Sequence, residues 1–451
     1  METAIFAKHA TRQLSTGGFV LALNVEAKID GQAEAMLQAL HSRSTGGIES
    51  HLKILEEKGA ENFMEKFYVG YGHKSIGDCG SVTVFIEGVS MLAAKAIQDW
   101  RLYSGQEAST RYVDFSRQKF LNPADTKDGE EILEDWRKFY LDAQKPLIVH
   151  LKKQFPKKDT ENQGVYDKAI IARAFDITRS FLPAGATTNL SWRMNFRQFS
   201  DELMLLRHHP LEEIRDIAEK TEEALKELYP SSFGQERFPH TEEYNKNWMQ
   251  KGYYYQNDDC RDFTLLYDKV DRKMLASYEN VLKTRPMKTE LPMAIAECGV
   301  VAYEFLLDFG SYRDLQRHRA IVQRMPLLTR THGFNPWYLN SLPDELREKA
   351  EKFIKLQEER IAKLKISKEL EQYYNAMGYR VACRLSGDLK AIVYLVELRS
   401  TRFVHATLVE QMLKMTKSLK ELFEKDGLIL HLDDEPNRFD IRRGQQDITE
   451  K

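Results

Sequence analysis

The sequence has few cysteines and no long apolar run. Its four cysteines never form a C-x-x-C pair; they are Cys79, Cys260, Cys298 and Cys383. This spacing favours neither a structural zinc site nor a disulfide framework. No apolar run approaches the ~20 residues that a membrane helix needs, and the first residues lack a basic segment followed by an apolar one. We therefore expect no metal, no membrane partner and a reducing, cytoplasmic compartment.

The sequence also lacks an excess of charge of either sign. Lys plus Arg total 66 and Asp plus Glu total 68, which leaves a formal charge of −2 over 451 residues. Proteins that coat nucleic acid by releasing counterions are usually strongly basic, so we expect no nucleic-acid partner. The 42% of apolar residues excludes wholesale disorder. The length predicts more than one domain.

Secondary-structure patterns indicate a helix-dominated α+β protein. Residues 81–89 are β-branched and aromatic, which is typical of a strand, and Ser90 is a candidate N-cap for a helix that ends near residue 98. Apolar periodicity predicts further helices over 130–154, 199–228, 291–318, 344–382 and 404–425. The stretch 229–260 differs in composition, because it is rich in Tyr, Asn and Gln, and it indicates a boundary between two halves of the chain. We expect two domains, residues 1–240 and 241–451.

Two segments about half a chain apart indicate an internal repeat. Residues 98–112 align with residues 316–330, and Arg101 then matches Arg319. Each segment is followed later by a predicted helix with a Leu-Arg pair, Leu206-Arg207 in one half and Leu398-Arg399 in the other. A period this long predicts a tandem domain duplication rather than a solenoid.

Both segments are rich in arginine, with Ser, Glu or His close by. A guanidinium group binds phosphate through two hydrogen bonds and stays charged at any working pH. The clusters therefore indicate sites for a phosphorylated nucleotide and a diphosphate cofactor. Taken singly, each arginine is also compatible with an ordinary surface ion pair.

The ordered combination resembles the flavin-dependent thymidylate synthases (ThyX). Their signature is Arg-His-Arg, seven further residues and Ser, with Glu two before the Ser and Arg two after it. The first half has Asp99-Trp100-Arg101, then Glu107, Ser109 and Arg111 at these spacings. Other blocks of the family are matched, in order, by His73, Arg179-Ser-Phe-Leu-Pro183, Asn195-Phe-Arg197 and Leu206-Arg207.

The second half keeps the parts that the first half has lost. It has the intact triplet Arg317-His318-Arg319, with Leu398-Arg399 and His405 further on, but Met325, Leu327 and Thr329 stand where the first half has Glu, Ser and Arg. The first half in turn has Asp99 and Trp100 in its triplet. Enzymes of the family that this sequence resembles are homotetramers whose sites are shared between subunits. The resemblance therefore implies a homodimer of two-domain chains, a pseudo-tetramer.

The resemblance implies two tandem ThyX-like domains, each with a central antiparallel sheet. The implied activity is the reductive methylation of dUMP to dTMP, with methylenetetrahydrofolate as carbon donor, FAD as cofactor and NADPH as reductant. Two alternatives stay open. One is a divergent enzyme that acts on another pyrimidine nucleotide, and Asp99 and Trp100 favour it. The other is a non-catalytic nucleotide-binding or scaffold protein.

The resemblance also implies roles for single residues. Ser109, Arg111 and Arg179 would bind the nucleotide phosphate, Arg207 or Arg399 would polarise the uracil carbonyls, and Glu107 would lie near the sugar or the flavin. The residues implied to hold FAD are Arg317, His318, Arg319, His405, Asn195, Arg197 and His73. For His73 and His405, a hydrogen-bonded structural histidine is the open alternative.

Overall fold

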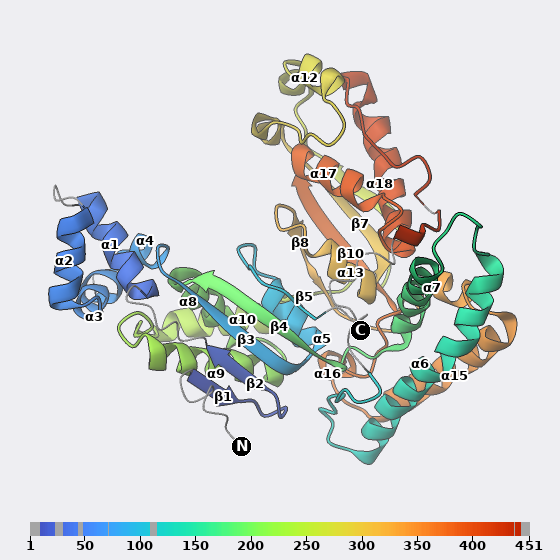
Figure 1. Cartoon of the computed structure of the whole chain (residues 1–451), viewed down its shortest axis with the longest axis horizontal. Coiled ribbons are helices and arrows are strands. Elements are labelled where there is room, and N and C mark those ends of the chain that lie inside the picture. The colour runs from blue at the N-terminus through green and yellow to red at the C-terminus, as the bar shows by residue number, and fades with distance from the viewer. Residues whose placement is uncertain are drawn as a thin grey trace. The chain divides into compact units, whose positions relative to one another are not determined.

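Two compact units make up the chain in the computed structural model (Figure 1). The structure describes residues 10–22, 30–43, 48–70, 72–108, 115–436 and 438–442. Unit 1 comprises residues 1–113 and 186–253, and unit 2 comprises residues 114–185 and 254–451. The segment 114–185 thus packs with the second unit although it lies in the first half of the sequence. The expected boundary between residues 240 and 241 stays a prediction.

A four-stranded antiparallel sheet of order β1-β2-β3-β4 is the centre of unit 1. Helix α9 packs against β1 and β2, and α8 follows β4 directly. The elements of unit 1 are β1 Ala10–Gln13, β2 Phe19–Ala22, α1 Gly31–Arg43, α2 Ile48–Lys58, α3 Glu61–Phe63, the π-helix η2 Met64–Gly70, α4 Lys74–Gly77, β3 Ser81–Ser90, α5 Met91–Gln98, β4 Thr187–Asn195, α8 Phe196–Leu206, α9 Glu212–Leu228 and α10 Pro239–Gly252.

Unit 2 repeats this plan with a sheet of order β6-β7-β10-β8, again antiparallel. Its strands are β5 Tyr254–Tyr255, β6 Phe263–Asp268, β7 Val300–Asp308, β8 Val322–Gln323, β9 Met325–Pro326 and β10 Arg380–Asp388. Its helices are α6 Lys127–Gln154, α7 Gln163–Thr178, η3 Arg179–Phe181, α11 Arg272–Ala276, α12 Glu279–Thr284, η4 Met293–Cys298, α13 Phe309–Leu315, α14 Pro336–Asn340, α15 Asp344–Lys363, α16 Lys368–Glu371, α17 Leu389–Arg399, α18 Ala406–Phe423 and η5 Glu424–Asp426. The α+β prediction, with an antiparallel sheet in each half, is confirmed.

Strand–helix junctions recur in the two units. Ser90 caps the helix after β3 and Asp308 caps the helix after β7, in the same register that aligns Arg101 with Arg319. Asn195 caps α8 after β4, and Asp388 caps α17 after β10 in the same way. The chain between the two junctions is longer in the first repeat than in the second, and α7 lies in that longer interval.

The segment 114–185 is held in unit 2 by aromatic packing and by paired turns. Trp136 and Phe139 of α6 contact Phe353 of α15, with ring centroids 4.9 and 4.7 Å apart. The turn before β4 pairs with the equivalent turn before β10, where Pro183 bridges Ala376. Burial of large aromatic rings is a major source of stability, so this segment is an integral part of unit 2.

Three predicted helices are wrong in detail. The predicted helix over 291–318 contains the strand β7, whose residues are buried on both faces and therefore show no alternation. The predicted helix over 344–382 ends at Lys363, where Lys365 takes a left-handed conformation (φ 52°), and β10 begins at Arg380. The predicted helix over 199–228 is split between α8 and α9, with Pro210 in the break.

Candidate functional site

A cluster of arginines surrounds one carboxylate in unit 2. Burial alone would raise the pKa of Asp314, on α13, but nearby guanidinium groups lower it overall. These guanidinium groups belong to Arg179, Arg317, Arg399 and Arg313. We call Asp314 and these four arginines the Asp314 cluster. Because Arg179 comes from the first repeat and the others come from the second, the cluster combines residues of both halves.

Arg179 enters the cluster from the start of η3, directly after α7. Burial favours a lower pKa of its guanidinium, and the acidic groups Asp176, Tyr338, Asp314 and Asp308 raise the pKa overall. Its Nε is buried and has no hydrogen-bond partner among the described residues. A buried donor without a partner is costly, so this atom is suited to an anionic ligand.

His318 and Arg399 form a direct hydrogen bond in the same region. Arg399 Nε, at the end of α17, donates to His318 Nε2 at 2.7 Å. Burial, with help from Arg399, lowers the pKa of His318 to about 3. The imidazole is therefore neutral at physiological pH, with Nε2 as the acceptor. Its two neighbours in the triplet, Arg317 and Arg319, are exposed, and Arg317 Nε lies 3.7 Å from Asp314 Oδ1.

His405 is part of a buried polar network instead of an open surface. It is 2% exposed and precedes α18 as its N-cap. Its Nδ1 lies 2.8 Å from Thr407 Oγ1 and 3.2 Å from Ser311 Oγ, and its Nε2 lies 3.2 Å from the carbonyl oxygen of Asp176. These contacts favour the structural alternative for His405, and its flavin contact stays a prediction.

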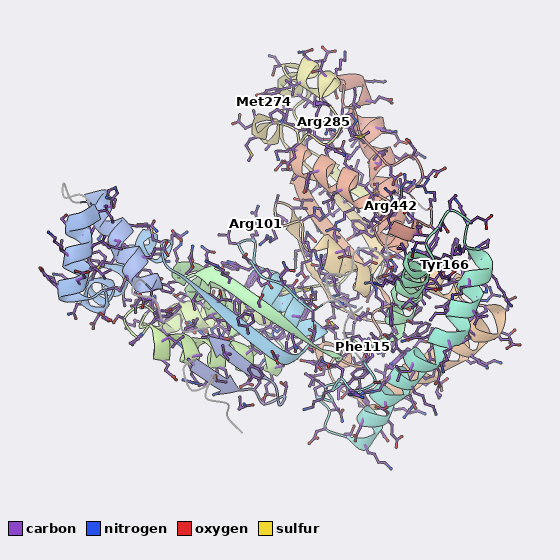
Figure 2. The ribbon with its side chains drawn as sticks, in the orientation of Figure 1. Arg101, Phe115, Tyr166, Met274, Arg285 and Arg442 are labelled. Carbon is purple, nitrogen blue, oxygen red and sulfur yellow. The ribbon has the colours of Figure 1, made fainter. Side chains whose placement is uncertain are left out.

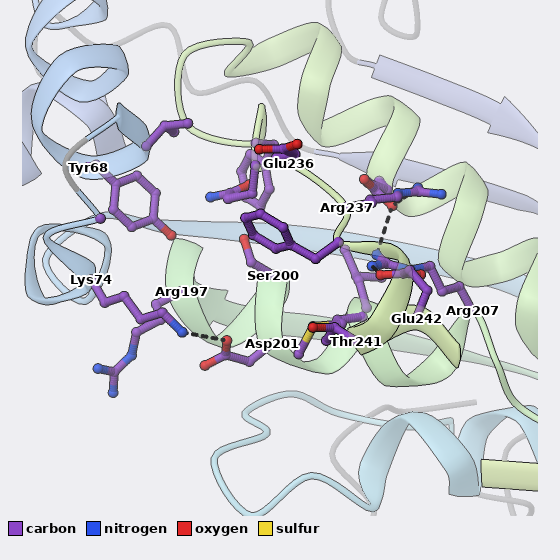
Figure 3. Close-up of a pocket in the computed structure, with 18 residues that line it drawn as sticks. Tyr68, Lys74, Arg197, Ser200, Asp201, Arg207, Glu236, Arg237, Thr241 and Glu242 are labelled. Carbon is purple, nitrogen blue, oxygen red and sulfur yellow. Dashed lines mark hydrogen bonds and ion pairs between the residues drawn. The ribbon is translucent and has the colours of Figure 1, made fainter. Parts of the chain in front are cut away.

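Arg197 and Arg207 line a pocket of about 360 Å³ in unit 1, on one face of α8 (Figure 3). We call it the α8 pocket. Arg207 donates to both carboxylate oxygens of Glu242, with Nε at 2.8 Å. Arg197 Nε lies 3.0 Å from Asp78. Ser200, Asp201 and Met204 also line the pocket from α8. Both arginines thus have acidic partners, which a ligand would have to displace or share.

The remaining predicted residues of unit 1 have varied surroundings. Asn195 caps α8 and donates to Asp78 at 3.1 Å. Glu107 accepts from Lys95 at 2.6 Å in a buried ion pair, and Gln98 donates to the same oxygen. His73 is exposed directly before α4. Ser109 and Arg111 lie outside the described residues.

The first copy of the triplet is acidic and aromatic where the second is basic. Trp100 Nε1 donates to Gln198 at 2.8 Å. Glu202 on α8 is 2% exposed, and burial together with Asp99 raises the pKa of its carboxyl well above the ordinary value. Neither Glu202 nor Asp314 is among the residues predicted from the sequence. Spacing could have indicated Asp314, because it precedes Arg317 by three residues on a helical turn.

These features define a class of protein. It is a two-unit α+β chain with a basic site that joins residues of both repeats, which suits a phosphorylated ligand. Among the described residues, no group of three or more His, Cys, Asp and Glu could hold a metal ion. None of the described helices is long and apolar enough to cross a membrane.

Comparison with known proteins gives the family. Residues 25–231 match the family model described as thymidylate synthase complementing protein. A UPF0159 protein of Chlamydia muridarum is 27% identical over 418 residues, which covers 80% of this chain and 78% of that protein. A UPF0159 protein of Thermoplasma acidophilum is 25% identical over 442 residues, with 81% and 87% covered. These matches support a divergent ThyX-like relationship for this chain.

One comparison connects the chain to proteins named for an activity. The flavin-dependent thymidylate synthase of Pyrococcus furiosus is 27% identical over 172 residues, which covers 36% of this chain and 63% of that protein. This shorter match and the family model both concern only part of the chain.

Proposed function

We propose that this protein is a flavin-dependent thymidylate synthase that converts dUMP to dTMP with methylenetetrahydrofolate and NADPH. The observation that carries the proposal is that the guanidinium groups of Arg179, Arg317 and Arg399 all act on the Asp314 carboxyl, with Arg317 Nε 3.7 Å from Asp314 Oδ1. The resemblance assigns these three residues separately to phosphate, flavin and pyrimidine. Their proximity supports one composite site built from both repeats.

Electrostatics supports an anionic ligand at this site. Four guanidinium groups act on the single carboxylate of Asp314, and the exposed side chain of Arg317 offers hydrogen-bond donors to solvent. Arginine is the residue of choice for bidentate phosphate recognition. In the proposed function, Arg179 binds the nucleotide phosphate. Arg399 fixes the orientation of the neutral His318.

The same residues fit an anionic flavin. Flavin supplies hydride transfer when it is bound. Arg317, His318 and Arg319 would hold FAD, and the buried, unpartnered Nε of Arg179 is consistent with an additional anionic oxygen nearby. In unit 1, we propose that Asn195 and Arg197 contact the flavin. Arg207 is the alternative to Arg399 as the residue that polarises the pyrimidine carbonyls.

The proposal includes a dimer of chains. Ser109 and Arg111 of one copy would combine with the triplet of the second repeat. Two-fold association is the commonest route to such an assembly.

Absorbance spectroscopy of the purified protein tests the proposal. A flavin spectrum that changes on addition of dUMP is expected for the wild-type chain. Arg179→Ala should weaken dUMP binding by about 1.5–3 kcal/mol, the range for a hydrogen bond to a charged group. Arg347→Ala is the matched control, because the Arg347 side chain is 39% exposed and pairs with Asp344 one turn away on α15. A colourless protein that does not bind dUMP would contradict the proposal.

A second candidate is a related enzyme that acts on another pyrimidine nucleotide. Asp99, Trp100 and the buried Glu202 favour it, because they give the first triplet position a different chemistry from the second. Spectral titrations with UMP and dCMP beside dUMP separate the two candidates. Tighter binding of UMP or dCMP would favour the second.

A further inference from the structure

Helix α17 carries a pocket that is the repeat equivalent of the α8 pocket. In the register that matches Asn195 with Asp388, the residues Ser200, Asp201 and Met204 correspond to Val393, Tyr394 and Glu397, and these three line a pocket of about 450 Å³ in unit 2. We call it the α17 pocket. Its far wall comes from the segment after α12, beginning at Arg285 (labelled in Figure 2), and from residues 431–433. The same helix face therefore bears a pocket in both repeats, but the chemistry differs.

The charged groups inside the α17 pocket are already paired. Arg285, 6% exposed, donates to both carboxylate oxygens of Glu397, and His431 N donates to Glu397 Oε1 at 2.8 Å. Asp433 is paired with Arg402, and Glu290 is paired with Lys390. The remaining charged group, Lys288, is exposed to solvent. A charged ligand would have to break these pairs, so the pocket favours an uncharged one.

Apolar and aromatic side chains stand open in the same pocket. Met287 is 63% exposed, Tyr394 is 43% exposed and Leu398 is 42% exposed. Exposed apolar side chains that gather around a hollow of this size are typical of ligand sites. Aromatic rings and methionine both favour contact with flat rings. The volume suits a molecule of one or two rings.

The pocket also adjoins the Asp314 cluster within unit 2. The Tyr394 ring centroid lies 6.0 Å from that of His318, and α17 ends at Arg399, the hydrogen-bond donor to His318. A ligand that contacts Tyr394 would therefore be separated from His318 by a single side chain.

From this geometry we propose that the α17 pocket binds a small, uncharged, planar aromatic molecule. The proposal goes beyond the proposed function and does not depend on it, because it concerns a pocket whose charged lining residues are paired with other side chains or face solvent. At the equivalent helix positions the first repeat has Ser200 and Asp201, whereas the second has Val393 and Tyr394.

Saturation-transfer NMR and calorimetry with indole as the probe test this proposal on the full chain, without nucleotide. Indole should bind the wild-type protein. Leu398→Gln and Tyr394→Ser should each weaken indole binding at least tenfold with little change in melting temperature, since both side chains are partly exposed. Leu356→Gln is the matched control, because Leu356 is 49% exposed on α15 and does not line the pocket.

Three results would overturn the proposal. Wild-type protein that fails to bind indole at millimolar concentration is the first. Equal binding of indole by the Leu398→Gln variant is the second, and equal affinity for indole and for anionic indole-3-carboxylate is the third. Mass measurement in solution tests whether a second copy of the chain occupies the pocket instead. If Leu398→Gln halves the particle mass and indole does not bind, the pocket is an interface between two copies. Loss of dUMP binding with indole binding retained would contradict only the proposed function.

Discussion

Arg399 Nε donates to His318 Nε2 across 2.7 Å, so the buried histidine of the triplet acts as a hydrogen-bond acceptor. This arrangement requires a neutral imidazole. Arg399 and burial therefore favour the same protonation state, and the pKa of His318 is lowered to about 3.

We predict that the His318 ring does not titrate between pH 5 and 8 in the wild-type protein. In Arg399→Met the loss of the cation should raise the pKa of His318, which NMR of the histidine ring carbons can follow. The folded pKa is lower than the ordinary value of 6.5. The native state thus binds fewer protons, and His318 makes the free energy of unfolding fall as pH decreases from 6.5 towards 3. An unchanged His318 titration in Arg399→Met would contradict the assigned hydrogen bond.

We predict that Glu202→Gln stabilises the protein at high pH. Burial raises the pKa of Glu202 well above 4.5, so the native state keeps a proton that the unfolded state loses. The contribution of this group to stability is present below pH 4.5 and is lost as pH rises towards the folded pKa. Denaturant unfolding at pH 5 and pH 8.5 should show a larger advantage of Glu202→Gln at pH 8.5. The exposed Glu219→Gln on α9 is the control, and a pH-independent difference would contradict a neutral Glu202.

We predict that Lys95→Met destabilises unit 1 by about 3–5 kcal/mol, because it leaves the buried carboxylate of Glu107 without its cation. The double variant Lys95→Met/Glu107→Gln should recover part of that loss. Denaturant unfolding of Lys95→Met, Glu107→Gln and the double variant measures the coupling. Lys145→Met, at an exposed position on α6, is expected to change stability little. A loss in the double variant equal to the sum of the two single losses would show that the pair is not coupled.

We predict two dUMP and two FAD for each dimer of chains. Only the site type that combines Ser109 and Arg111 with the second triplet would be competent, because Asp99 in the other type repels an anion. Calorimetry with mass measurement in solution gives both numbers. Four equivalent sites per dimer, or a monomer, would contradict the proposed sharing of sites.

Local elements with their own sequence signals are predictable. The strand and helix on either side of Ser90 are confirmed, and Ser90 Oγ accepts from the backbone N of Ala93 at 3.0 Å. The sequence predicts a helix where β7 lies, because burial on both faces removes the alternation that distinguishes strands. The break between α15 and β10 depends on a left-handed residue, Lys365, at a position where the sequence has no glycine.

The repeat, its register, the arginine motif and the α+β class all follow from the sequence alone, because periodicity and spacing are properties of neighbouring residues. Which charges meet is a property of the folded chain. Arg179 joins Asp314, Arg317 and Arg399 in unit 2, whereas Arg207, equally basic in sequence, pairs with Glu242. Partners far apart along the chain are brought together by the packing of whole elements. The charge that each arginine can offer a ligand therefore follows from the fold.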